Sequence, residues 1–190
     1  MIANVPSLLD HLETYLGEIR AGFAGDDATT PGVQVVRFGP DQPFKGVTTV
    51  STLGLSHHYL SQPASPDVRQ ELLMHVPEYG QPPNLAGVML QVAGELIHNH
   101  RCLLRGEVIG PRGVLFAGTG MTAFYGAMPV YLPDDFAFYA NDSGPIALTW
   151  LVPITDGEAD FIATYGWPAF EGVLESQDPD LTDFNRPSLY

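Results

Sequence analysis

The sequence predicts an α+β fold: a single domain in which a mostly antiparallel or mixed sheet is flanked by helices. The chain has 190 residues, a length that suits one domain of ordinary size. Segments with helical periodicity stand near the start, the middle and the end of the chain, and short β-type segments lie between them. These segments do not alternate as regular strand–helix–strand units, so an open parallel sheet is not expected.

The N-terminal part predicts one helix followed by a connector. Apolar residues recur at helical spacing over residues 8–20, and Ser7 suits the N-cap position. Residues 22–32 contain turn-forming residues and acids, which predict a loop. We therefore expect residues 1–30 to form an N-terminal helix and a connector, which is too short to separate two domains.

The next segments predict strands and then the clearest helix of the chain. Residues 33–38 and 46–55 are rich in β-type side chains and predict two strands joined by a turn. Residues 67–76 alternate between two classes of side chain, and the flanking prolines favour a strand over a short helix. Apolar residues within 85–100 follow the i, i+3, i+4, i+7 spacing of an amphipathic helix with one buried face.

The C-terminal half predicts short strands and two helices. The strands are expected at residues 103–109, 114–117, 123–125, 136–139 and 146–152, between turn-forming pairs of residues. A helix is expected over residues 155–165, because Thr155 and Glu158 have the spacing of a capping box. A second helix is expected over residues 168–175, with Pro168 at its first position. The last fifteen residues predict a polar tail.

The charge of the chain limits its partners. Eight Lys and Arg residues stand against 22 Asp and Glu residues, which gives a formal net charge of −14 at pH 7. Binding to a nucleic-acid backbone requires a basic face, so nucleic acid is not an expected partner, and anionic membrane surfaces are disfavoured. A strongly acidic protein attracts basic proteins at long range, although the same charge also serves solubility.

Cysteine content and hydropathy indicate the compartment. Cys102 is the single cysteine, which excludes an internal disulfide and a cysteine-rich zinc site and suits a reducing compartment. The N-terminal segment lacks a basic region, so no signal peptide is expected. The apolar runs are far shorter than the roughly 20 residues of a membrane-spanning helix. We therefore expect a cytoplasmic domain.

One motif suggests a nucleotide cofactor. Residues 118–123 (GTGMTA) match the pattern G-x-G-x-x-G/A of dinucleotide-binding folds, in which glycines let the backbone approach a pyrophosphate. Gly126 and Pro129 leave room for only a very short helix after the motif, and no strand–helix–strand pattern surrounds it. A glycine-rich hairpin turn is the favoured interpretation of Gly118 to Ala123, and no cofactor is expected.

Histidines are the remaining candidates for metal ligands. His98 and His100 are two residues apart, which places them on nearly opposite sides of a helix. Glu95 and His98 make one E-x-x-H pair, whereas a dimetal bundle requires two such pairs. His57 and His58 are adjacent and would face opposite sides of a strand. Surface or hydrogen-bonded histidines are the favoured interpretation, so no metal site is expected.

No set of residues predicts catalysis. Cys102 lies between Arg101 and Arg105, which could lower the pKa of its thiol, but a small buried side chain is the favoured interpretation. Lys45 is the only lysine and a weak candidate for Schiff-base chemistry. The acids that cluster at turns and helix starts are Asp134, Asp135, Asp156, Glu158 and Asp160. No catalytic, cofactor-binding, metal-binding or partner-binding residue is therefore assigned.

The C-terminal third resembles the suppressor-of-fused domain family. The resemblance rests on LVPITDGEADFIATYGWPAFEGVLE at residues 151–175 and on NRPSL at residues 185–189. Earlier segments agree with it: QPFKGVTTVSTLGLSHHYL at 42–60, ELLM at 71–74 and GEVI at 106–109. The similarity covers residues 30–190, and it implies that residues 30–190 form one globular unit, a suppressor-of-fused-like domain.

The resemblance implies a non-enzymatic α+β binding domain, similar to the N-terminal lobe of suppressor of fused. Animal members of the family form a two-lobed clamp that sequesters zinc-finger transcription factors, but this chain matches only the first lobe. Stand-alone prokaryotic members resemble immunity proteins that neutralise a partner toxin in polymorphic toxin systems. The resemblance therefore implies a protein partner, such as a basic nuclease toxin, and leaves the binding residues and the oligomeric state open.

Two other functions stay open. The chain could be a regulatory or scaffold domain that binds a short peptide at a sheet edge. A less favoured alternative is an enzyme that uses a nucleotide at Gly118 to Ala123. The residues that carry the family resemblance have structural roles in our interpretation: Thr155 and Glu158 cap a helix, Gly166 ends it, Trp167 and Phe170 anchor helices in the core, and Arg186 pairs with a carboxylate.

Overall fold

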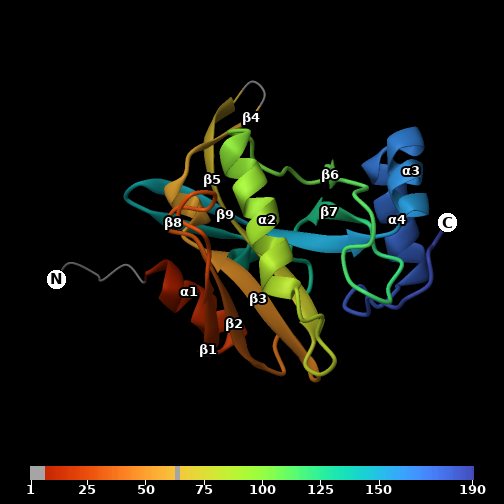
Figure 1. The fold of residues 1–190 in the computed structure, drawn as a ribbon, viewed down its shortest axis with the longest axis horizontal. Helices are drawn as coiled ribbons and strands as arrows, with labels where there is room; N and C mark the ends of the chain where they lie inside the picture. Colours follow the sequence, from red (N-terminus) through yellow and green to blue (C-terminus); the bar gives the residue numbers. More distant parts are fainter. Residues whose placement is uncertain (1–6, 63–64) are drawn as a thin grey trace.

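The computed structural model describes residues 7–62 and 65–190, and a mixed sheet lies at its centre (Figure 1). The sheet has nine strands in the order β1-β2-β3-β5-β9-β7-β6, with β4 paired to β5 and β8 paired to β9. The strands are β1 (Ile19–Ala24), β2 (Gln34–Pro40), β3 (Val47–Leu53), β4 (Leu60–Gln62), β5 (Ser65–Pro77), β6 (Val108–Ile109), β7 (Ala123–Ala127), β8 (Phe138–Asn141) and β9 (Gly144–Ile154).

Four α-helices accompany the sheet in the described part of the chain. They are α1 (Leu8–Leu16), α2 (Leu85–His98), α3 (Asp156–Tyr165) and α4 (Trp167–Gln177), and two short 3-10 turns are η1 (Leu55–His57) and η2 (Asp134–Phe136). None of these helices is both long and apolar enough to cross a membrane. Residues 1–6, which enter the signal-peptide prediction, lie outside the described residues.

One strand pair makes the sheet mixed rather than antiparallel. All neighbouring strands run antiparallel except β5 and β9. Residues Arg69–Leu73 of β5 pair in parallel with residues Ile146–Trp150 of β9. A parallel pair requires a crossover connection. The chain between β5 and β9 supplies this connection and carries α2, β6, β7 and β8. The predicted α+β class with a mixed sheet and flanking helices is confirmed.

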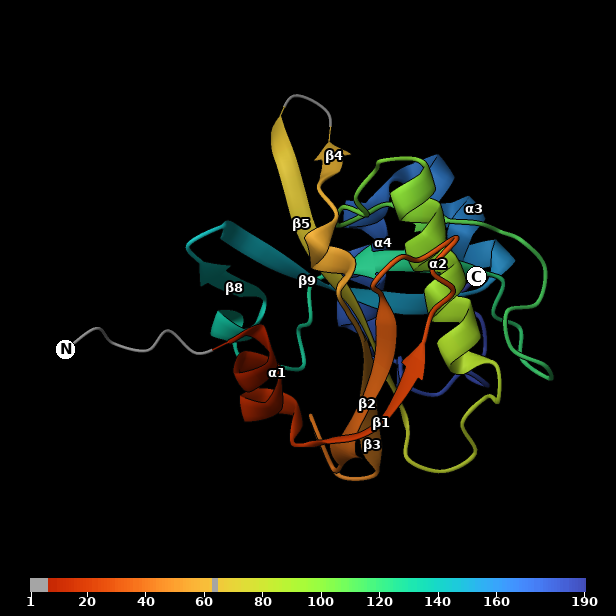
Figure 2. The same cartoon turned by 60° about the vertical axis from the view of Figure 1, so that its left-hand side comes forward.

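Each face of the sheet has its own hydrophobic core. In Figure 2, α2 lies on one side of strands β2 and β3, and α1 lies on the other side near β8. Side chains alternate along a strand, so Leu72 and Met74 of β5 enter the core beneath α2, whereas Leu73 enters the core beneath α1. Ile162 of α3 and Phe170 of α4 join this second core. The central strands are therefore buried on both faces.

The N-terminal helix is shorter than predicted, and the connector contains an additional strand. Helix α1 ends at Leu16, because Gly17 adopts φ 78° and its N–H bonds to the carbonyl oxygen of Glu13. Strand β1 follows and pairs with β2, so the predicted helix at 17–20 and the predicted loop at 22–24 are wrong. The side chains of β1 are largely exposed, and the strand therefore lacks the regular apolar alternation that identifies strands in a sequence.

The middle of the chain contains less strand than predicted. Only the last two residues of 103–109 form a strand, β6, and residues 114–117 form none. Phe116 is fully buried and stacks on Phe184 at 4.8 Å between ring centres, so the apolar character of this segment reflects a buried loop. Phe136 belongs to η2, and β8 begins two residues later. The elements predicted at 33–38, 46–55, 67–76, 85–100, 123–125 and 146–152 are confirmed with small shifts at their ends.

The C-terminal helices begin and end close to the predicted residues. The hydroxyl of Thr155 accepts a hydrogen bond from the N–H of Glu158, and the Glu158 carboxylate accepts one from the N–H of Thr155 at 2.9 Å. This capping box starts α3, and Gly166 ends it at φ 82°. Phe170 anchors α4 in the core as predicted, and α4 starts one residue earlier than predicted, at Trp167.

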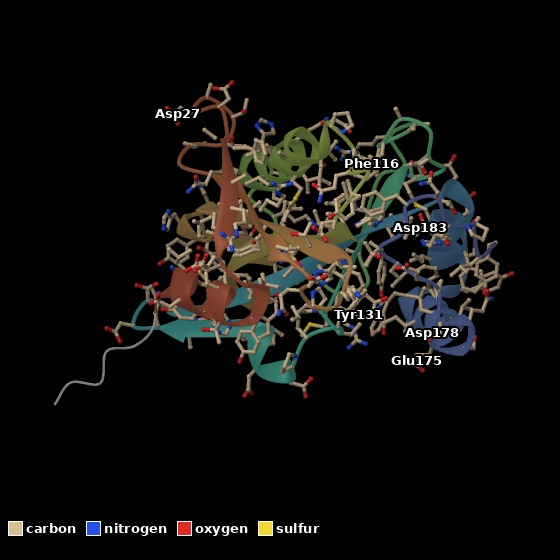
Figure 3. All side chains as sticks on the ribbon, turned by 90° about the horizontal axis from the view of Figure 1, so that it is seen from below. Asp27, Phe116, Tyr131, Glu175, Asp178 and Asp183 are labelled. Carbon is tan, nitrogen blue, oxygen red and sulfur yellow. The ribbon has the colours of Figure 1, made fainter. Side chains whose placement is uncertain are left out.

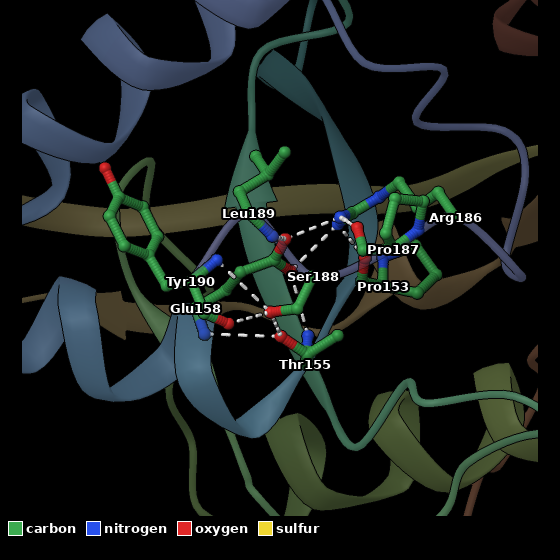
Figure 4. A network of polar contacts seen from close by, with 8 residues as sticks. All are labelled: Pro153, Thr155, Glu158, Arg186, Pro187, Ser188, Leu189 and Tyr190. Carbon is green, nitrogen blue, oxygen red and sulfur yellow. Dashed lines mark hydrogen bonds and ion pairs between the residues drawn. The ribbon is translucent and has the colours of Figure 1, made fainter.

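A buried ion pair fastens the C-terminal tail to the start of α3 (Figure 4). Arg186 donates to the two carboxylate oxygens of Glu158 at 2.5 and 2.9 Å, and both side chains are almost completely buried. Arg186 also donates to the carbonyl oxygen of Pro153, and Glu158 accepts a bond from the N–H of Leu189. The predicted pairing of Arg186 with a carboxylate is confirmed.

Replacing Arg186 with methionine is expected to lower the free energy of unfolding by about 3–5 kcal/mol, because Glu158 then stays buried without its counter-charge. Urea denaturation at pH 7 measures this loss. The matched control is Arg101→Met, which breaks the more exposed pair with Glu107 and is expected to cost less than about 1 kcal/mol. Equal losses in the two variants would contradict the fastening role of the buried pair.

Candidate functional site

The glycine motif at residues 118–123 does not have the geometry of a dinucleotide site. It lies in the loop between the antiparallel strands β6 and β7, and β7 begins at Ala123. A dinucleotide fold instead places a helix N-terminus after the glycines, where backbone N–H groups meet the pyrophosphate. Gly118 adopts φ 83°, which suits a glycine in a turn. The geometry therefore favours the turn interpretation.

The candidate histidines lie at helix ends and in loops. His98 ends α2, and His100 lies two residues beyond the helix. His57 ends η1, and Nε2 of His58 lies 2.9 Å from the carbonyl oxygen of Pro31. Across residues 7–62 and 65–190, no group of three or more His, Cys, Asp or Glu side chains is placed to hold a metal ion.

Cys102 and the predicted acids belong to different segments of the fold. Cys102 is buried, and burial together with Glu107 raises the pKa of its thiol despite the nearby Arg101. A thiol with a raised pKa is a poor nucleophile at neutral pH. Asp134 and Asp135 lie in η2, Asp156, Glu158 and Asp160 lie in α3, and Lys45 is exposed. The Glu158 carboxylate is engaged in the buried ion pair with Arg186.

A cavity that the sequence analysis did not identify is the best candidate site. It has a volume of about 240 Å³ and is formed by β7, β9, the loop after β7, and α4 with the segment that follows it. We call it the aromatic cavity, because Tyr125, Tyr131 and Trp150 line it, with Glu175 and Asp178 among its polar residues. Figure 3 shows Glu175 and Asp178 together at the end of α4, on the same side of the molecule as Tyr131.

A set of charge interactions closes one side of the aromatic cavity. Arg105 donates two hydrogen bonds to the Glu171 carboxylate at 3.0 and 2.5 Å, and the Tyr125 phenol donates to the same carboxylate at 2.8 Å. Burial acts to raise the pKa of Glu171, but the hydrogen bonds from Arg105 and Tyr125 outweigh it and lower the pKa overall. Burial and the bond to Glu171 raise the pKa of Tyr125, so the phenol stays protonated at neutral pH.

Trp167 has a different role from the one predicted. Its side chain is 37% exposed instead of anchored in the core. Its ring covers Gly106, where an added Cβ atom would lie 2.4 Å from ring atoms. The guanidinium of Arg105 lies 4.9 Å from the centre of the ring, within the range of a cation–π interaction. Trp167 therefore helps to hold Arg105, which lines the cavity, against Glu171.

The wall around Trp150 contains buried polar atoms without hydrogen-bond partners. In the described part of the chain, Nε1 of Trp150 and Nε2 of His75 are both of this kind. The two rings lie 5.1 Å apart, and the ring of Tyr131 lies 4.9 Å from that of Trp150. The hydroxyl of Thr49 holds Nδ1 of His75 at 2.8 Å. Burial lowers the pKa of His75 to about 3, so this imidazole is neutral at pH 7.

The chemistry of the cavity suits binding. Glu171 and Tyr125 are held in hydrogen bonds and are not poised as a base or a nucleophile. Apolar and aromatic walls with a few polar groups are typical of recognition sites. The sequence carries one signal for this site: Glu171 and Glu175 lie one turn apart on α4, and Asp178 follows directly after the helix.

The neutral state of His75 predicts a pH dependence of stability. The unfolded chain takes up a proton on this histidine below about pH 6.5, whereas the folded chain does so only near pH 3. As the pH is lowered from about 6.5 to about 3, the free energy of unfolding is therefore expected to fall by up to roughly 1.4 kcal/mol for each pH unit. Urea denaturation from pH 7.5 to pH 4.5 measures the slope.

The His75→Gln variant is expected to show a shallower slope, because glutamine does not titrate. The exposed histidine variant His98→Gln is the matched control and should keep the slope of the parent chain. If His75→Gln loses stability on acidification as steeply as the control, another group carries the dependence.

Comparison with known proteins gives the family. The family model described as "Suppressor of fused protein (SUFU)" matches residues 29–187. The crystal structure of a SUFU homologue from Neisseria gonorrhoeae FA 1090 is similar with a TM-score of 0.74 and 20% identity, covering 95% of this chain and 93% of that chain. The crystal structure of the Sufu–Fu complex is similar with a TM-score of 0.71 and 12% identity, covering 95% of this chain and 90% of that chain.

Drosophila Suppressor of Fused is similar over part of its length. Its crystal structure matches with a TM-score of 0.60 and 14% identity, covering 82% of this chain and 42% of that chain. No curated protein sequence matches this chain. The solved structures, at these identities, show a shared fold. Because the family model spans most of the sequence, from residue 29 to residue 187, the chain belongs to the suppressor of fused protein (SUFU) family.

Proposed function

We propose that this chain is a protein-binding domain that neutralises a basic partner toxin in a polymorphic toxin system. The observation that carries the proposal is the net charge of −14. Five ion pairs within the described chain each use a different carboxylate, so seventeen of the 22 Asp and Glu residues lie outside ion pairs. Such an excess of negative charge speeds the encounter with a basic protein.

The family supports a binding role without naming the partner. In one similar structure, Sufu is in a complex with Fu. A toxin that cleaves nucleic acid needs a basic surface to contact the phosphate backbone. An acidic domain can cover such a surface, so a basic nuclease toxin is the partner class that the charge favours.

Affinity capture from the native cell, followed by co-expression, tests the toxin proposal. We expect a basic protein to be retained in low-salt washes and released in high-salt washes, because salt screens the attraction between opposite charges. Expression of the captured protein alone is expected to arrest growth, and co-expression of this chain is expected to relieve the arrest. A captured partner that is harmless, or a toxicity that this chain leaves unchanged, overturns the proposal.

The association rate with this partner is expected to depend on salt. Raising the NaCl concentration from about 0.05 M to about 0.5 M should lower the association rate constant by roughly tenfold, because screening removes long-range steering. Stopped-flow or biosensor kinetics with the purified partner measure the rate. A rate constant that stays the same across this range contradicts the role given to the net charge.

The enzyme alternative makes an opposite prediction. A nucleotide bound at 100 times its dissociation constant would stabilise the fold by about 2.7 kcal/mol. Because a strand follows the motif at Gly118 to Ala123, we expect NAD, NADP and FAD at millimolar concentration to leave the Tm unchanged. A saturable rise in Tm with any of the three would revive the nucleotide-dependent enzyme.

A second candidate is a regulatory or scaffold domain that binds a peptide at a sheet edge. Strand β1 ends the sheet, and in the described part of the chain it pairs with β2 alone. An extended peptide can add to such an edge through backbone hydrogen bonds. Binding that N-methylation of alternate peptide residues abolishes would favour this candidate over a folded partner.

A further inference from the structure

We propose that the aromatic cavity receives a single lysine or arginine side chain from the partner, and so fixes the position of the partner on this domain. The inference rests on the proposed function, because it assumes a basic protein partner. It goes further by naming the site and the chemical group that the site takes.

The size of the cavity suits one side chain. Its volume of about 240 Å³ lies below the roughly 300–1,000 Å³ of pockets that enclose whole small-molecule ligands. Lysine and arginine pack their aliphatic stems along apolar surface and keep the charged end near polar groups. Tyr131, Trp150 and Leu174 give the cavity an apolar wall for such a stem, and aromatic faces also attract the cation.

The charges at the cavity favour a cation. Glu175 and Asp178 are exposed, and neither takes part in an ion pair within the described chain. The C-terminal end of α4 adds a partial negative charge next to them, because helix carbonyl groups point outward there. The last turn of α4 contains no basic residue. The helix therefore supplies no cation of its own at this end.

One basic side chain of the chain itself, Arg105, lines the cavity, and its hydrogen bonds are directed to another carboxylate. Arg105 is attracted by Glu175, but its two hydrogen bonds go to the Glu171 carboxylate and its guanidinium lies over the ring of Trp167. With that pair cancelled, Glu175 and Asp178 leave an excess of two negative charges. An anionic ligand is disfavoured for the same reason.

Trp150 lies in the cavity wall, where its indole signal reports on what the cavity contains. Its side chain lines the cavity and is 1% exposed, and its Nε1–H has no hydrogen-bond partner. Buried donors in folded proteins are nearly always satisfied, because an unpaired one loses its bond to water without replacement. Trp150 offers an apolar ring in the cavity wall, and Glu175 and Asp178 supply the negative charges for the cation of one basic side chain.

Proton–nitrogen NMR of the whole chain tests the proposal, because the chain has two tryptophans and therefore two indole N–H signals. The probes are the capped tripeptides acetyl-Gly-Lys-Gly-amide and acetyl-Gly-Arg-Gly-amide, with acetyl-Gly-norleucine-Gly-amide as the uncharged control. The Trp167→Phe variant assigns the two signals. We expect the lysine or arginine probe to shift the Trp150 indole signal saturably and the norleucine probe to leave it in place.

Two charge variants locate the binding. The double variant Glu175→Gln with Asp178→Asn is expected to weaken the binding of the cationic probe by about fivefold or more, because it removes two attractive charges. The double variant Asp27→Asn with Asp67→Asn removes the same charge from exposed residues outside the cavity, and Figure 3 shows Asp27 far from Asp178. It should change the affinity less than about twofold.

The outcomes separate this inference from the proposed function. A Trp150 signal that neither cationic probe moves, or that all three probes move equally, overturns the cavity proposal. If a basic toxin still binds with a salt-dependent rate in that case, the proposed function stands alone. If the cationic probes bind at Trp150 but no basic partner is found, the cavity proposal stands and the toxin proposal fails.

Discussion

The parallel pairing of β5 with β9 is the constraint on which the rest of the structure depends. These strands are far apart in the sequence, and a parallel pair forces the chain between them to cross over the sheet. The crossover places α2 on one face and returns through β7 and β8, which both pair with β9. Both faces of β9 are then covered, and the strand is buried without a break from Leu148 to Ile154.

The same pairing explains why a cavity forms where it does. Trp150 is the last β9 residue paired with β5, opposite Leu73, and it is also paired with Ala127 at the end of β7. After Ala127 the chain leaves the sheet. The first part of β9, from Gly144 to Ala147, is paired with β8. The loop between β7 and β8 carries Tyr131 across the ring of Trp150. The cavity is therefore the consequence of a change of strand partner, with α4 as its outer wall.

The elements that the sequence predicted correctly are those with a local signal. The capping box of Thr155 and Glu158 and the apolar spacing of α2 involve residues a few positions apart, so their pattern survives without tertiary context. Strand β1 owes its state to hydrogen bonds with β2, and Phe116 owes its burial to Phe184 in the tail. Neither cause is visible in a local window. The cavity draws on β7, β9 and α4 at once, and only the acids on and just after α4 mark it in the sequence.

Acidic residues serve two separate purposes in this chain, and the distinction bears on how it would bind. Glu71 is fully buried and has a structural role. Its carboxylate accepts hydrogen bonds from the N–H groups of Gly54 and Ser56 and from the hydroxyl of Thr52. The exposed acids instead make a field that acts beyond contact and that salt screens within about 8 Å. Such a field governs how fast a basic partner arrives, whereas a desolvated contact governs how long it stays. A side chain inserted beside Trp150 would therefore set the dissociation rate and the register of the complex. The dispersed charge alone gives attraction without a defined orientation, so a domain that relied on it would bind basic surfaces indiscriminately.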